Sequence, residues 1–177
     1  MVTRTKDGGT WRVGTQDDVA WIVDGTRASR TIAAAVPPVF DAYATIPLPT
    51  DDAAQEEHDR TVVALLSRWA ARPWWLGYLD TGADDLVFPD APVVTLYAGW
   101  SYVLVEAGPG QAATWRREGP GAFWKGSLPN LVFPADRSWL YSVLWDDDHA
   151  SLGGPEALVD AFARHPILHT ARVQSSP

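Results

Sequence analysis

Cysteine is absent from this sequence of 177 residues. Disulfide bonds are therefore excluded, and so are thiolate nucleophiles and thiolate metal ligands. Lysine is almost absent too, because Lys6 and Lys125 are the only lysines among 14 basic residues. With no disulfide framework to suggest an extracellular setting, we expect a cytoplasmic protein.

Long apolar runs are also missing. The longest, residues 32–40, is interrupted by Pro37 and Pro38, and it is far shorter than the roughly 20 residues that a membrane-spanning helix needs. Residues 1–9 are polar and contain no apolar segment of the kind that a secretory signal requires. We therefore expect no membrane contact, and a flexible N-terminal tail over residues 1–9.

Positive charge is scarce, since 14 Lys and Arg face 22 Asp and Glu, which gives a formal net charge of −8. Nucleic-acid binding needs a basic surface, so the sequence argues against it. The acidity either serves solubility alone or complements a basic partner, whose association it would steer. Charge by itself leaves both interpretations open.

The chain has the composition of a globular protein, with 46% hydrophobic and 20% charged residues. We predict one α+β domain over residues 10–170, followed by a flexible tail over 171–177. Its sheet should be mixed or mainly antiparallel, accompanied by two to four helices. Apolar, β-favouring stretches bounded by turn residues predict strands at 11–13, 19–23, 75–79, 93–97, 102–106 and 139–145.

The most regular helical pattern follows Thr50. Asp51 and Asp52 provide cap oxygens and negative charge where unpaired backbone N–H groups point outward. Apolar residues then recur with the spacing of one buried helix face, at Val62, Leu65, Leu66 and Trp69. A final helix is predicted after Pro155, with its apolar stripe at Leu158, Val159 and Phe162.

The chain contains an apparent internal repeat. The residues Leu-Val-Phe-Pro occur twice, 45 positions apart (131 minus 86), at 86–89 and 131–134. At the same offset other residues match, Trp100 with Trp145 and Gly108 with Gly153. Residues 86–116 and 131–161 are therefore predicted to form two similar β-hairpin-plus-helix units. Two units are too few for a solenoid, so they should pack into one sheet.

Two short motifs resemble those of enzymes. Residues 108–113 fit a relaxed G-x-G-x-x-A dinucleotide pattern, and residues 99–102 resemble part of a nucleophile elbow. The first follows the second arm of a predicted hairpin and not the first strand of a βαβ unit. The second has Val103 where the elbow requires glycine. We therefore assign no catalytic residue and expect no cofactor.

Asp146, Asp147, Asp148 and His149 form the densest acidic cluster. Consecutive residues in an extended chain point alternately to opposite faces, so the four side chains cannot converge on one cation. We predict no metal site here. A solvated hairpin turn accounts for the cluster, and a contact with a basic partner is the functional alternative.

The ten tryptophans fall into two groups. Trp69, Trp139 and Trp145 lie in patterned elements and are expected in the core. Others lie at element ends or in loops, where an indole either packs inside or anchors a partner or a sugar ring; these are Trp74, Trp75, Trp100, Trp115 and Trp124.

Several segments together carry a resemblance, namely residues 32–43, 74–82, 136–140, 144–148 and 153–160. They resemble a family of small, tryptophan-rich, uncharacterised actinobacterial proteins. More loosely, the chain resembles bacterial immunity proteins that neutralise toxins, including the SUKH group. The resemblance implies a protein partner and brings no catalytic residues.

The functional prediction is a non-enzymatic immunity or antitoxin protein that occludes a basic toxin domain by direct contact. Its candidate partner-binding residues are Asp80, Asp84, Asp85, Asp146, Asp147, Asp148, Trp74, Trp75 and Trp100. The alternative is a small-molecule binding protein, or an enzyme, with a tryptophan-lined pocket for a sugar or nucleotide.

Overall fold

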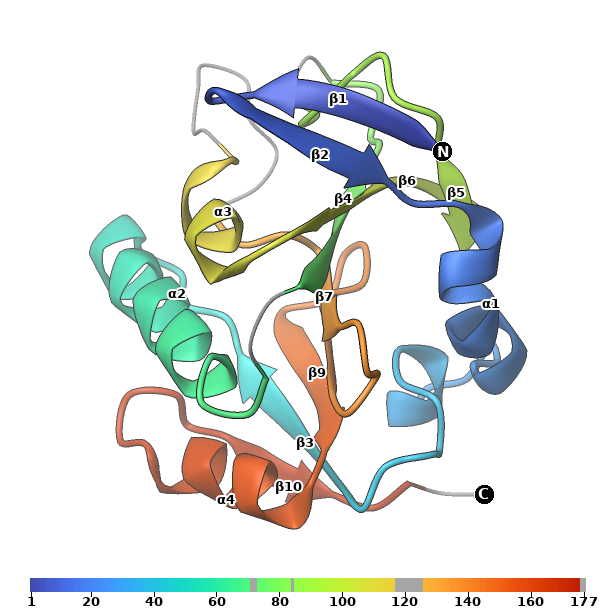
Figure 1. Ribbon diagram of the computed structural model, residues 1–177. Helices are drawn as coiled ribbons and strands as arrows, with labels where there is room; N and C mark the ends of the chain where they lie inside the picture. The colour runs from blue at the N-terminus through green and yellow to red at the C-terminus, as the bar shows by residue number, and fades with distance from the viewer. Residues whose placement is uncertain (71–72, 84, 117–125, 176–177) are drawn as a thin grey trace.

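The computed structural model describes residues 1–70, 73–83, 85–116 and 126–175. Within these ranges ten strands form one antiparallel sheet, accompanied by four α-helices (Figure 1). The predicted α+β class and antiparallel sheet are confirmed. No helix in the described part of the chain is both long and apolar enough to span a membrane.

The strands pair in the order β1-β2-β6-β4-β7-β8-β9-β3-β10, with β5 pairing on β6. Their bounds are β1 Val2–Lys6, β2 Gly9–Val13, β3 Ala42–Pro47, β4 Trp74–Leu79, β5 Val94–Leu96, β6 Trp100–Ala107, β7 Leu131–Pro134, β8 Leu140–Ser142, β9 His149–Gly154 and β10 Ala171–Val173. Strand β4 lies between β6 and β7, and this central position buries two of the predicted partner-binding residues, Trp74 and Trp75.

Helices cover both faces of this sheet. The elements are α1 Gln16–Gly25, the 3-10 helix η1 Ile32–Ala34, α2 Asp52–Leu66, α3 Pro109–Thr114 and α4 Glu156–Arg164. In Figure 1, α2, α3 and α4 lie on one side of the sheet, and α1 and η1 lie on the other. Two separate apolar clusters follow this division. We refer to the two sides as the α2 face and the α1 face.

Strand β4 illustrates how the two faces form. Trp74, Leu76 and Tyr78 belong to the cluster on the α2 face, whereas Trp75 and Leu79 belong to the cluster on the α1 face. Successive strand residues point to opposite sides, and every residue of β4 is buried. A continuous apolar run is the sequence pattern that such a doubly covered strand requires.

Helix α2 begins where it was predicted to begin. The side chain of its N-cap residue, Asp51, accepts a hydrogen bond of 2.9 Å from the backbone N–H of Ala54. Val62, Leu65 and Leu66 are buried, as the apolar spacing indicates. In α4 the predicted apolar stripe, Leu158, Val159 and Phe162, is fully buried as well.

The strand predicted at residues 19–23 is wrong, because these residues lie in α1. Thr15 and Asp18 form a reciprocal capping box that satisfies backbone N–H groups at the helix start. Val19 and Ile22 then fall three residues apart on the buried side of the helix. The local cap outweighs the β-branched composition of this segment.

Both predicted tails contain strands. Residues 2–6 form β1, which pairs with β2 through a tight turn at Asp7 and Gly8, whose φ angles of 51° and 74° suit a type I′ hairpin. Residues 171–173 form β10, which pairs with β3. Both lie at the ends of the strand order, and none of their residues is buried, so a polar sequence is tolerated there.

The two Leu-Val-Phe-Pro segments differ in conformation. Residues 131–134 form β7, whereas residues 86–89 contain no strand and Phe88 has a φ of 60°. The elements after each segment come in the same order, an antiparallel strand pair and then a helix: β5-β6-α3 and β8-β9-α4. That the two units share a three-dimensional structure stays a prediction.

Candidate functional site

A cavity of about 590 Å³ opens beside the first half of α2. Its lining comes from α2 and the segment before it, and from the residue that follows α3 and its C-cap. It also comes from residues 128–130 before β7, from strand β8 and from the turn between β8 and β9. The lining residues are Leu48, Pro49, Thr50, Gln55, Asp59, Arg116, Leu128, Pro129, Asn130, Tyr141, Val143, Trp145, Asp146, Asp147 and Asp148. We call this space the α2 cavity.

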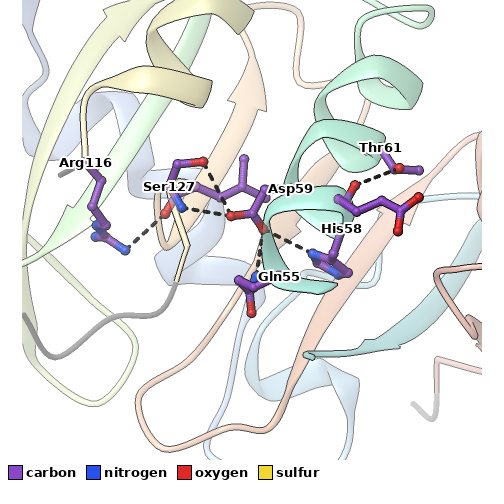
Figure 2. Close-up of polar contacts among 8 residues, drawn as sticks. Gln55, His58, Asp59, Thr61, Arg116 and Ser127 are labelled. Atoms are coloured by element: carbon purple, nitrogen blue, oxygen red, sulfur yellow. Dashed lines mark hydrogen bonds and ion pairs between the residues drawn. The ribbon is translucent and has the colours of Figure 1, made fainter. Parts of the chain in front are cut away.

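A buried carboxylate forms part of its wall. Asp59, which is 3% exposed, accepts hydrogen bonds from Nε2 of Gln55 at 2.7 Å and from the backbone N–H of Ser127 at 2.8 Å. Nδ1 of His58 lies 3.1 Å from the same carboxylate, and it carries the proton because an ionised carboxylate can only accept. Figure 2 shows these groups converging on Asp59. Gly126, at a φ of 82°, approaches so closely that a Cβ would collide with this carboxylate.

A buried guanidinium forms another part of the wall. Arg116 donates to the carbonyl oxygen of Leu128 at 3.0 Å and to Oδ1 of Asn130 at 2.5 Å. Its guanidinium carbon lies 5.3 Å from the ring centroid of Tyr78. Burial lowers the pKa of Arg116 to about 10, so the side chain stays charged at neutral pH.

The wall also carries polar atoms that the described hydrogen bonds leave unused. The hydroxyl of Tyr141, a residue 1% exposed, is buried and has no partner among the described residues, and burial raises the pKa of this tyrosine. Oδ1 of Asn130 accepts from Arg116 and from the backbone N–H of Leu79, and Nε2 of Gln55 donates to Asp59. These bonds fix both amide orientations, and none of them uses Nδ2 of Asn130 or Oε1 of Gln55.

The turn between β8 and β9 forms the acidic rim. Asp146 and Asp148 are exposed and Asp147 is partly buried, and all three residues line the α2 cavity. Nδ1 of His149 lies 3.0 Å from Oδ1 of Asp148, and this hydrogen bond lowers the pKa of Asp148. Burial raises the pKa of Asp147. No group of three or more metal-ligating side chains occurs in the described part of the chain.

A second hollow has a volume of about 500 Å³. Asp80, Trp100 and Trp145 line it together with Leu79, Thr81, Gly82, Gly99 and Ser101. Trp145 lines both spaces. The shared indole therefore joins Asp80 and Trp100 to the acidic turn. We call this set the acidic-aromatic surface, with the members Asp80, Trp100, Trp145, Asp146, Asp147 and Asp148.

Two predicted partner-binding residues lie inside the protein. Trp74 is 0% exposed and Trp75 is 4% exposed, because β4 is covered on both faces. Trp74 packs edge-on against Trp139, and Arg12 lies over the ring of Trp75 at 4.3 Å. Neither indole can reach a partner in the folded protein, so their assignment to a binding surface was wrong.

The remaining predicted residues divide between the surface and other places. Asp84 lies outside the described residues, as does Trp124. Asp85 is partly buried and acts electrostatically on Arg116, so it belongs near the α2 cavity. Trp145, expected in the core, is only partly buried and lies at the rim.

The two enzyme-like motifs have structures that do not suit their chemistry. Residues 108–113 open the short helix α3 after β6, whose neighbours β2, β4 and β5 are all antiparallel to it. A dinucleotide fingerprint needs a parallel βαβ unit. Residues 100–103 continue into β6 as a strand, whereas a nucleophile elbow turns sharply into a helix.

The polar wall of the α2 cavity was not predicted. Its members come from separate parts of the chain, and no short motif joins them. One signal was available: Gln55 and Asp59 precede Val62 and Leu66 at the three- and four-residue steps of the same helix face. Polar residues on a buried stripe require partners, and here they contribute the carboxylate of the wall.

Comparison with known proteins gives no match. No family model matches the chain, and neither a curated protein nor a solved structure is similar to it.

Proposed function

We propose that this protein is a non-enzymatic binding protein that uses the acidic-aromatic surface to recognise a basic protein partner, acting as an immunity or antitoxin protein that occludes a toxin. One observation carries the proposal. Asp80 and Trp100, far from the acidic turn in sequence, line a hollow together with Trp145, and Trp145 also adjoins that turn.

The charges of this surface suit a partner rich in arginine or lysine. With a net charge of −8, the chain attracts a cationic partner over a distance, and exposed carboxylates at Asp80, Asp146 and Asp148 direct its approach. Such rim charges act mainly on the association rate.

The partly buried indoles supply the other half of recognition. Trp100 and Trp145 line a concave space, and an arginine or lysine side chain placed over an indole gains a cation–π attraction as well as apolar contact. Tryptophans in such positions commonly account for much of the binding energy of an interface.

Protection of cells that express a toxin encoded beside this gene tests the proposal. We expect the wild-type chain to restore growth and to bind the purified toxin domain. Trp100→Ala should weaken binding by about tenfold or more, the loss typical of an interface anchor. Asp146→Asn combined with Asp148→Asn should slow association and reduce its dependence on salt.

Asp24→Asn is the matched control, since Asp24 is an exposed carboxylate on α1 and lines neither of the two hollows. It should leave binding and protection unchanged. Thermal unfolding of each variant establishes that it is folded. Absence of protection by the wild-type chain, or equal losses for Asp24→Asn and the double variant, would contradict the proposal.

A further inference from the structure

We infer that the α2 cavity is a binding site for an uncharged, polyhydroxylated ring, that is, a sugar of monosaccharide or disaccharide size. The site is distinct in chemistry from the proposed protein contact, although Trp145 and the acidic turn border both. The inference rests on the size of the cavity, on the unused polar atoms of its wall and on its charges.

Size and apolar surface suit a small ring. The volume of about 590 Å³ falls within the range of roughly 300 to 1,000 Å³ that is typical of small-molecule sites. Trp145, Leu128 and Val143 line the space. The C–H face of a sugar packs on such indole and aliphatic surfaces while its hydroxyls turn to polar groups.

The wall presents both donors and acceptors. The buried hydroxyl of Tyr141 has no partner among the described residues, and a buried polar atom without a partner destabilises the folded protein. The described bonds also leave unused one amide nitrogen, Nδ2 of Asn130, and one amide oxygen, Oε1 of Gln55. Sugar hydroxyls both donate and accept, so they can pair with groups of each kind.

The charges of the site favour a neutral ligand. The carboxylate of Asp59 and the guanidinium of Arg116 are both held by hydrogen bonds to the chain itself. A phosphate would meet the acidic rim at Asp146–Asp148. Deeper in the cavity the charges of Asp59 and Arg116 are opposite in sign, so they offer no net charge to attract an ionic ligand. A nucleotide is therefore disfavoured, and an uncharged ring is favoured.

Calorimetric titration of the full chain with charge-matched sugars tests this directly. The neutral probes are glucose, galactose, mannose, N-acetylglucosamine, maltose and cellobiose, and the charged probes are glucosamine and glucose 6-phosphate. We expect saturable binding of at least one neutral sugar at millimolar concentration or below, and weaker binding of the charged probes. Binding of only a charged probe, or of none of the panel, would overturn the inference.

Two tyrosine variants locate the site. Tyr141→Phe removes only the buried hydroxyl of a tyrosine that lines the cavity, and it should weaken sugar binding by about 5- to 10-fold, the loss expected for one hydrogen bond. Tyr102→Phe is the matched control, because its hydroxyl is equally buried and unpartnered but belongs to the α1 face. It should leave the affinity unchanged.

Both variants should remain folded, since each deletes a hydroxyl that makes no hydrogen bond in the described structure. Trp145→Ala is a second test at the rim and should also weaken binding. Equal affinities for wild type, Tyr141→Phe and Trp145→Ala would place any sugar elsewhere and overturn the assignment.

Discussion

Both faces of the sheet are covered by helices, yet they bury different chemistry. On the α1 face, Val19 and Ile22 pack with strand residues such as Leu104 in an apolar cluster. The α2 face has a larger apolar cluster, but beside the α2 cavity it also buries two charged side chains, Asp59 and Arg116. The contrast coincides with the position of the α2 cavity.

The difference is informative because buried charges seldom increase stability. Desolvation of a carboxylate or guanidinium costs several kcal/mol, which hydrogen bonds only partly offset. An apolar set of side chains under α2 would serve packing equally well, as the α1 face demonstrates. Polar groups that border an open cavity are therefore better explained by a ligand than by stability.

The largest expected effect comes from breaking the polar wall. Asp59→Ala should lower the free energy of unfolding by about 4 kcal/mol, because Gln55, His58 and the N–H of Ser127 lose their acceptor while buried. Chemical denaturation measures this change. Glu57→Ala, an exposed position on the same helix, is the control and should change it by less than about 0.5 kcal/mol. A loss below about 1 kcal/mol for Asp59→Ala would mean that the network is not formed.

A substitution that creates a void in the apolar cluster of the α1 face should have the next largest effect on the unfolding free energy. Ile22→Ala deletes a fully buried side chain of the α1 face and should cost about 3 kcal/mol in unfolding free energy. Val23→Ala, at a 40% exposed position of the same helix, should cost far less. Ile22 does not line the α2 cavity, so its loss should leave sugar affinity unchanged. A parallel loss of affinity would argue that the α1-face cluster supports Trp145, which packs against it.

Alkaline pH should lower the unfolding free energy by a smaller amount per residue, through buried tyrosines that lie on both faces. Burial raises the pKa of Tyr78 and Tyr141 on the α2 face and of Tyr102 on the α1 face. An unfolded tyrosine ionises near pH 10, so the folded state holds more protons above that pH. The stability that each tyrosine confers is complete below pH 10 and falls by about 1.4 kcal/mol per pH unit above it. Arg116 acts in the opposite sense, because its pKa is lowered to about 10.

Denaturation curves measured roughly every half pH unit between pH 9 and pH 11, around the tyrosine pKa, check this predicted loss of stability. Tyr141→Phe and Tyr102→Phe should each remove about the same part of the alkaline slope. A smaller change for Tyr141→Phe would indicate that water in the α2 cavity solvates its hydroxyl, and would sharpen the contrast between the faces.

Local patterns predicted the elements whose stability is local. The cap at Asp51 and the spacing of Val62, Leu65 and Leu66 placed α2 correctly, since both signals act within one or two helical turns. The same argument placed α4. The strand predicted at residues 19–23 rested on β-favouring composition alone, and the capping box of Thr15 and Asp18 starts a helix there instead.

The candidate site depended on contacts that local patterns do not encode. Trp74 and Trp75 follow Pro73 and were predicted at a surface, but β6 and β7 flank them and helices cover both faces. The sequence marked Asp80, Trp100 and the acidic turn separately. Their meeting around Trp145 required the whole sheet to form.

By itself the sequence determined that the protein has no disulfides, carries a net charge of −8 and folds as an α+β domain around tryptophans. Composition and short-range periodicity are sufficient for these properties. Only the tertiary structure decided which tryptophans are buried, which acidic residues share a surface, and that Asp59, Arg116 and Tyr141 line one cavity. The physical reason is that burial and strand pairing depend on residues far apart in the chain, whereas helix caps and apolar stripes depend on neighbours.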